Sequence, residues 1–233
     1  MTNSETAKAH DVSYIAADWA RYQAIERLIN HWNRPGWTDG RRSYHWLVPF
    51  DDQPAVQALA ARCQAQLRDC SHLDLVPLSS LHITMHRVGF TDEMNRTDAV
   101  AVAEAARRDC ASLLPFTLQI GPLAGSPGAV RFSAGPHAPV RQVLEIVRAA
   151  SAEARAVPPE LSGTDEFIPH VSIAYNNAEV PARSMIERVA ALRALGSAAV
   201  RLDHIDLVEL RRQGRSYVWD TVARIGFGPD RRG

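Results

Sequence analysis

Two short, strand-like runs with the same side-chain pattern constrain the fold of this sequence more than any other feature. Residues 82–85 read H-I-T-M and residues 170–173 read H-V-S-I. Side chains alternate between the two faces of a strand, so each run places a histidine and a hydroxyl on one face and two apolar side chains on the other. One such run among nine histidines is an expected accident. Two copies favour a fold that brings the two histidines to one site.

Helical and strand-like segments alternate along the chain. Apolar residues at intervals of three and four predict helices over 12–32, 53–69, 97–114, 138–155 and 181–196. Alternating and β-branched runs predict strands over 43–50, 73–90, 116–121, 130–133, 169–175, 199–210 and 216–226. The turn formers of residues 122–128 predict a hairpin between two of these strands. The chain is therefore mixed α/β, and the order strand, helix, motif strand, helix, strand occurs twice.

This repeated order predicts two similarly built lobes, with His82 and His170 related by pseudo-symmetry across a central cleft. We expect an N-terminal extension with a helix over residues 1–42, a single bilobal domain over 43–226 and a C-terminal tail over 227–233. A chain of 233 residues that is 46% hydrophobic can bury a large core.

Charge and composition limit the classes of partner. The chain carries 26 basic and 26 acidic residues, so no global field attracts nucleic acid, and any nucleic-acid substrate should be short or held locally. The first ten residues lack the features of a secretory signal, and no run is long and apolar enough to span a membrane, so we expect a cytosolic protein. Cys63, Cys70 and Cys110 form no C-x-x-C pair, which favours buried thiols over a disulfide framework.

The repeated side chains fit one type of chemistry. An imidazole with a pKa near its usual value of about 6.5 can act as acid or base at neutral pH, so two histidines can supply both functions. The hydroxyls of Thr84 and Ser172 can donate hydrogen bonds to the non-bridging oxygens of a tetrahedral anion. In-line displacement at phosphorus fits this arrangement and requires no metal.

With their His-apolar-hydroxyl-apolar pattern, residues 82–85 and 170–173 resemble the paired motifs of the two-histidine (2H) phosphoesterase superfamily, which includes 2′-5′ RNA ligase-like proteins and RNA cyclic phosphodiesterases. The resemblance covers roughly residues 43–226. It implies an α+β, bilobal fold with two antiparallel sheets around a central cleft and helices outside. It also implies that His82 and His170 are the catalytic pair and that Thr84 and Ser172 bind phosphate.

The function implied by the resemblance is that of a metal-independent hydrolase. The expected enzyme is a phosphodiesterase that acts on an RNA end or small nucleotide carrying a 2′,3′-cyclic phosphate or a 2′-5′ linkage. No cofactor, metal or membrane is expected to take part. The predicted helix over 12–32 lies outside the resemblance, and a lid and an oligomer contact are both open roles for it. The oligomeric state is undetermined.

Two further residues are candidates for substrate binding, each with a plainer alternative. His86 shares the predicted face of His82, at the rim of the cleft, but an exposed surface position is favoured. A zinc site on these two histidines is disfavoured, because on a strand their Cα atoms would lie roughly 13 Å apart. Phe132 could stack a base, although core packing is favoured. Its neighbour Arg131 faces the other way, so at most one of the two points into the cleft.

Other functions on the same fold stay open. A strand-joining RNA ligase or a phosphoesterase acting on a small metabolite would use similar motifs, and a non-catalytic module could retain the phosphate-binding groups. Neutral net charge and the lack of a basic, aromatic-rich stripe favour small substrates over long RNA. The sequence contains no glycine-rich nucleotide-binding or nucleophile-elbow motif.

Overall fold

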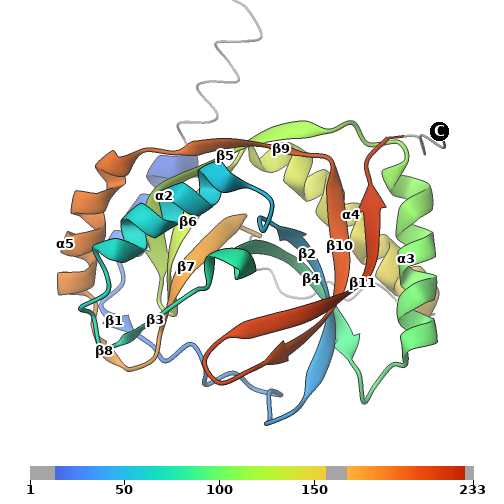
Figure 1. Cartoon of the computed structure of the whole chain (residues 1–233), viewed down its shortest axis with the longest axis horizontal. Helices are drawn as coiled ribbons and strands as arrows, with labels where there is room; N and C mark the ends of the chain where they lie inside the picture. Colours follow the sequence, from blue (N-terminus) through green and yellow to red (C-terminus); the bar gives the residue numbers. More distant parts are fainter. Residues whose placement is uncertain (1–13, 156–166, 229–233) are drawn as a thin grey trace, which may run out of the picture.

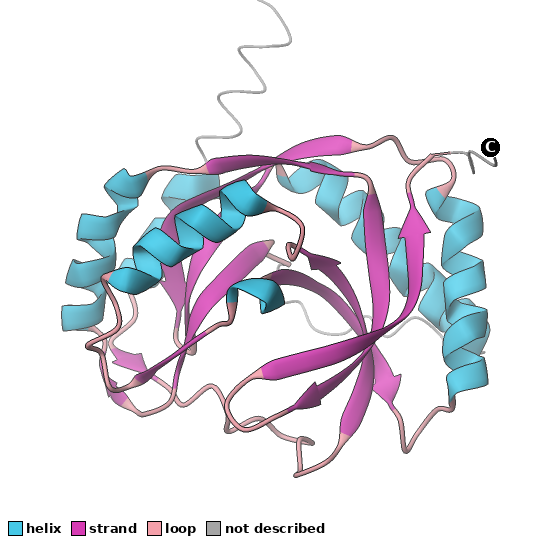
Figure 2. Ribbon diagram, in the orientation of Figure 1, coloured by secondary structure: helices cyan, strands magenta, loops and turns pink. Residues whose placement is uncertain are grey.

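The computed structural model describes residues 14–155 and 167–228, and its helices lie outside two antiparallel sheets (Figures 1 and 2). The first sheet, here the β4 sheet, has the order β11 (Tyr217–Gly226), β10 (His204–Arg212), β2 (Arg42–Pro49) and β4 (His82–Phe90). The second, here the β7 sheet, has the order β3 (Leu73–Leu75), β7 (His170–Asn176), β6 (Ala129–Gly135), β5 (Phe116–Ser126) and β9 (Ala198–Leu202). The α+β fold with two antiparallel sheets is confirmed.

The two sheets interlock, because neither is made from one continuous half of the chain. Helix α2 (Pro54–Ala65) follows β2 of the β4 sheet but packs against β9 and β7 of the β7 sheet. Helix α4 (His137–Arg155) follows β6 of the β7 sheet but contacts β4 of the β4 sheet. Helix α3 (Arg96–Cys110) packs beside α4 and β11, and α5 (Arg183–Leu192) packs against β5 (Figure 1). Each half of the sequence therefore contributes to both lobes.

Local sequence explains the helix ends. Asn95 caps α3 by accepting a hydrogen bond from the Asp98 backbone N–H, and the Asp98 side chain accepts one from the Asn95 backbone. Pro54 begins α2 at the position where its missing N–H costs no helical hydrogen bond. Two 3-10 turns, η1 (Leu78–Ser80) and η2 (Arg193–Leu195), precede β4 and β9.

The structure corrects four of the predicted elements. The run predicted as strand over 73–90 contains β3, the 3-10 turn η1 and β4, and β3 and β4 belong to different sheets. The N-terminal helix ends at residue 23 rather than 32, because β1 (Arg27–Leu28) pairs with β8 (Val180–Pro181). The turn predicted over 122–128 is mostly strand, since β5 continues to Ser126. The run predicted as one strand over 199–210 is split between β9 and β10, which belong to different sheets. In each case long-range pairing overrides the local pattern.

The core lies mainly between the sheets and their helices, and Trp46 and Phe132 are among its largest fully buried side chains. The three cysteines are free and buried, as expected. Burial raises the pKa of the Cys63 and Cys110 thiols to about 11, so both are protonated at neutral pH. In the described part of the chain no helix is long and apolar enough to span a membrane.

Candidate active site

The two motif strands share a β-bulge at the fourth residue of each motif. In the pairing of β2 with β4, Leu47 lies opposite Thr84 and Trp46 lies opposite His86, so Met85 is the extra residue. In the pairing of β6 with β7, Arg131 lies opposite Ser172 and Val130 lies opposite Ala174, so Ile173 is the extra residue. An extra residue interrupts the alternation of side chains. The equivalent bulges strengthen the internal symmetry that the motifs indicate.

The four motif side chains meet at one cavity of about 540 Å³. His82 and Thr84 line it from the β4 sheet, and His170 and Ser172 line it from the β7 sheet. The volume lies within the range of small-molecule sites in proteins. The sequence prediction that these residues come together is met by the geometry, while their catalytic roles stay predictions.

Both motif histidines have the same hydrogen-bonding arrangement. Nδ1 of His82 lies 2.8 Å from the carbonyl oxygen of Ser80, and Nδ1 of His170 lies 2.8 Å from that of Ile168. A carbonyl oxygen only accepts, so Nδ1 of each ring carries the hydrogen and donates it. Nε2 is then the nitrogen of each ring that can exchange a proton with a substrate.

The surroundings of the two histidines differ in charge. Burial and the nearby charge of Arg131 lower the pKa of His170 to about 3. Burial also lowers the pKa of His82, whose ring makes an edge contact with the indole of Trp219 at 5.2 Å between centroids. Burial therefore opposes protonation of both rings, and a neighbouring cation opposes it further at His170.

The cavity collects positive charge although the whole chain is neutral. Arg34, Arg131 and Arg148 line it, and no carboxylate is among the described residues that do so. The arrangement favours an anionic ligand. The described residues contain no group of three or more histidine, cysteine or acidic side chains placed to hold a metal ion.

Arg131 is held in place by the N-terminal helix. Its Nη2 donates to Oδ1 of Asp18 at 2.6 Å, and the hydroxyl of Ser133 donates to the other oxygen of the same carboxylate. Arg131 and Ser133 lie opposite Ser172 and His170 in the pairing of β6 with β7. The helix of the extension thus packs against the part of β6 that supports the second motif.

The structure does not bring the two lesser candidates, His86 and Phe132, to the cavity. His86 lies across from Trp46, and cross-strand partners share a face. The indole nitrogen of Trp46 donates to Ser151 of α4, so this face is turned toward the helix. The bulge at Met85 is the reason that His86 does not follow His82 and Thr84. Phe132 is fully buried in the core, and its neighbour Arg131 lines the cavity instead.

Several cavity residues were missed by sequence reasoning. Simple alternation along the strand would turn Tyr175 to the face opposite Ser172, but the bulge at Ile173 returns it to the cavity. His31 falls within the range 12–32 predicted as helix, and Arg34 comes just after that range. His45 on β2 also lines the cavity and is buried, and its pKa is lowered to about 3, chiefly by burial. No local signal distinguishes these residues, because their placement depends on distant partners.

Comparison with known proteins agrees with this fold. The model of the 2′-5′ RNA ligase superfamily matches residues 50–214. The crystal structure of TT0787 of Thermus thermophilus is 18% identical, with a TM-score of 0.57, over 82% of this chain and 99% of that chain. The structure of E. coli LigT complexed with 3′-AMP is 14% identical, with a TM-score of 0.60, over 80% of this chain and 98% of that chain. No curated protein matches the chain. Because the family model covers well over half of the sequence, the chain belongs to the 2′-5′ RNA ligase superfamily of two-histidine phosphoesterases.

Proposed function

We propose that this protein is a metal-independent phosphodiesterase that hydrolyses a 2′,3′-cyclic phosphate or a 2′-5′ linkage in a small nucleotide or at an RNA end. The observation that carries the proposal is the convergence of two histidines, with the same tautomer, and two hydroxyls on one cationic cavity. E. coli LigT, which has this fold, has been solved with 3′-AMP, ATP and NADP⁺, which supports a nucleotide as the class of substrate.

The different surroundings of the histidines favour one assignment of their roles. Burial and the charge of Arg131 keep His170 neutral, so its Nε2 suits the general base that takes a proton from the attacking water. No neighbouring cation lowers the pKa of His82, so a proton on this ring meets less opposition than a proton on His170. His82 is therefore the general acid. The water oxygen bonds to phosphorus, the bond to one ribose oxygen breaks, and that oxygen takes the proton of His82.

The remaining polar groups stabilise the charge on phosphorus. Thr84 and Ser172 donate hydroxyl hydrogen bonds to the non-bridging oxygens, one from each sheet. Arg131 lies across the strand from Ser172 and adds a positive charge beside it. Because Asp18 holds the Arg131 side chain, this charge is in position before substrate binds.

Turnover of 2′,3′-cyclic nucleotides and 2′-5′ dinucleotides in the presence of a chelator tests the proposal. His82→Ala and His170→Ala should each lower kcat/KM by about 10²- to 10⁴-fold, the usual contribution of a general acid or base. His86→Ala is the matched control on the same strand and should leave turnover unchanged. Unchanged turnover in either motif variant would contradict the mechanism. Stoichiometric nucleotide binding without turnover would instead support a non-catalytic module, and joining of strands would support a ligase.

A further inference from the structure

Residues 30–37 of the extension contribute one wall of the cavity, through His31, Arg34 and Trp37, and connect the two sheets. The ring of His31 stacks on Tyr175 of β7, with 3.9 Å between centroids. Its Nε2 lies 3.1 Å from the hydroxyl oxygen of Tyr217 on β11. Trp32 makes a similar connection, since its indole nitrogen donates to Asp74 of β3 and its carbonyl oxygen accepts from Arg212 of β10. All of this wall precedes the region matched by the family model.

Arg34 projects a positive charge from this wall. Its Nη2 donates to Nδ1 of His31 at 3.3 Å, which leaves the other ring nitrogen of His31 to donate to Tyr217. Arg131 is paired with Asp18, whereas Arg34 contacts no carboxylate within residues 14–155 and 167–228. The guanidinium of Arg34 is therefore a cavity-lining cation whose charge no carboxylate among the described residues neutralises.

Arg34 and Arg131 have different neighbours in the cavity. Arg131 lies opposite Ser172 in the pairing of β6 with β7, beside the hydroxyl of the second motif. Arg34 contacts His31, whose ring stacks on Tyr175 and lies 3.1 Å from the hydroxyl oxygen of Tyr217. Arg131 is therefore the cation beside a motif hydroxyl, and Arg34 is the cation beside the aromatic rings that line the same cavity.

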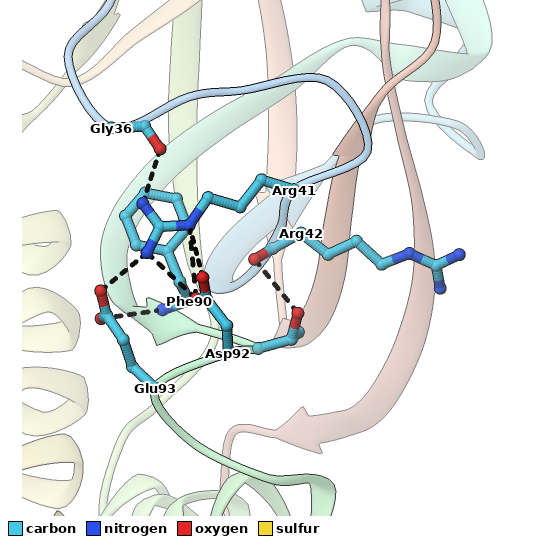
Figure 3. A network of polar contacts seen from close by, with 7 residues as sticks. Gly36, Arg41, Arg42, Phe90, Asp92 and Glu93 are labelled. Carbon is cyan, nitrogen blue, oxygen red and sulfur yellow. Dashed lines mark hydrogen bonds and ion pairs between the residues drawn. The ribbon is translucent and has the colours of Figure 1, made fainter.

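The loop that carries Arg34 is fixed to the β4 sheet at its far end (Figure 3). Arg41 donates to the carbonyl oxygen of Gly36 at 2.7 Å and to the carboxylates of Asp92 and Glu93, just after β4. Its guanidinium lies over the ring of Phe90, 3.4 Å from the centroid. The loop is thus attached at His31 and again at Gly36, which limits the positions that Arg34 can take.

We propose that Arg34 binds a second phosphate group of the substrate, so that the enzyme selects nucleotides that carry a phosphate in addition to the scissile one. This inference rests on the proposed function for the nucleotide nature of the ligand. The aromatic and histidine wall between the two phosphate positions accommodates the nucleoside. The selected class is a nucleotide with a 5′-phosphate as well as the 2′,3′-cyclic phosphate or its 2′-phosphate product.

Equilibrium binding of two product-like nucleotides to the full chain tests this inference without requiring turnover. Isothermal titration should show that adenosine 2′,5′-bisphosphate binds the wild-type chain about tenfold or more tightly than adenosine 2′-monophosphate, as expected for a charge-assisted contact. Arg34→Ala should abolish the difference and leave the affinity for the monophosphate unchanged. Arg34→Lys should retain part of it. Arg183→Ala, which removes an exposed arginine on α5, is the control for total charge.

Three outcomes would overturn the inference. The first is equal affinity of the wild-type chain for the two nucleotides. The second is an equal loss of both affinities in Arg34→Ala, because Arg34 would then serve the scissile phosphate. The third is no binding of either nucleotide. Selective binding that depends on Arg34, in a chain whose turnover does not depend on His82 and His170, would support the inference while contradicting the proposed function.

Discussion

Asp18 and Arg131 form an ion pair whose side chains are 1% and 6% exposed, with 2.6 Å between Oδ1 and Nη2. Asp18 belongs to the N-terminal helix, and Arg131 belongs to β6, beside the second motif. When one partner of a buried ion pair is removed, the other charge stays buried without compensation and destabilises the fold. The helix of the extension is therefore part of the support of the cavity.

Removing Asp18 should strongly destabilise the chain. Asp18→Ala leaves the guanidinium of Arg131 buried without its partner, which costs about 3–5 kcal/mol in the free energy of unfolding. Urea denaturation gives this value, with the exposed Asp39→Ala as control. The double variant Asp18→Ala, Arg131→Met removes both charges and should recover part of the loss. If Asp18→Ala lowers the free energy of unfolding no more than Asp39→Ala does, this account is wrong.

Close packing of the N-terminal helix predicts a second effect on stability. A Cβ atom at Gly125 would lie 2.2 Å from the ring of Tyr22, which is fully buried. Gly125→Ala should lower the free energy of unfolding by about 1–3 kcal/mol, the usual cost of overpacking. Gly226→Ala is the control, since its Cβ would meet no atom closer than 4.0 Å. If both alanine variants unfold at the same urea concentration, the helix is not packed as described.

Stability should fall in acid because buried histidines are neutral in the folded chain. The pKa of His31 and of His45 is lowered to about 3 by burial, against about 6.5 in an unfolded chain. Between these values the unfolded chain binds more protons, so stability is complete above pH 6.5 and is lost as pH falls toward 3. Each histidine contributes up to about 1.4 kcal/mol per pH unit in that window.

Urea denaturation at several pH values measures this slope, and His45→Asn should reduce it. The comparison uses the slope rather than the stability itself, because the substitution also changes packing around a buried side chain. An unchanged slope in His45→Asn would show that this ring does not resist protonation in the folded chain.

A plot of kcat/KM against pH should be bell-shaped, with its maximum below pH 6.5. The base, His170, is neutral above about pH 3, and the acid, His82, is protonated only below a pKa that burial lowers from 6.5. The kcat/KM profile reports these values in the free enzyme, so it should decline as pH rises through the pKa of His82. A bound phosphate favours the protonated imidazole, so the alkaline limb of kcat should lie at higher pH than that of kcat/KM. A kcat/KM profile with its maximum above pH 7 would contradict the assignment.

The predicted elements closest to the structure are those defined by long local patterns. The helix predicted over 138–155 is α4, and the strand predicted over 43–50 is β2. The helix predicted over 12–32 was wrong beyond residue 23, because the spacing of Ile25 and Ile29 matches a helix while the chain there pairs with residues far away in sequence. Ile29 is half exposed, which a helical core face would not allow.

By itself, the sequence determined the two motif strands and the four side chains that meet at the cavity, since alternation in a strand can be read from adjacent residues. Only the tertiary structure decided which way the side chains point in the residues that follow Thr84 and Ser172. The bulges at Met85 and Ile173 exist only in pairing with β2 and β6, and they turn His86 away from the cavity and Tyr175 toward it. Long-range contacts also place Arg34 of the extension on the wall of the cavity, where no local pattern could locate it.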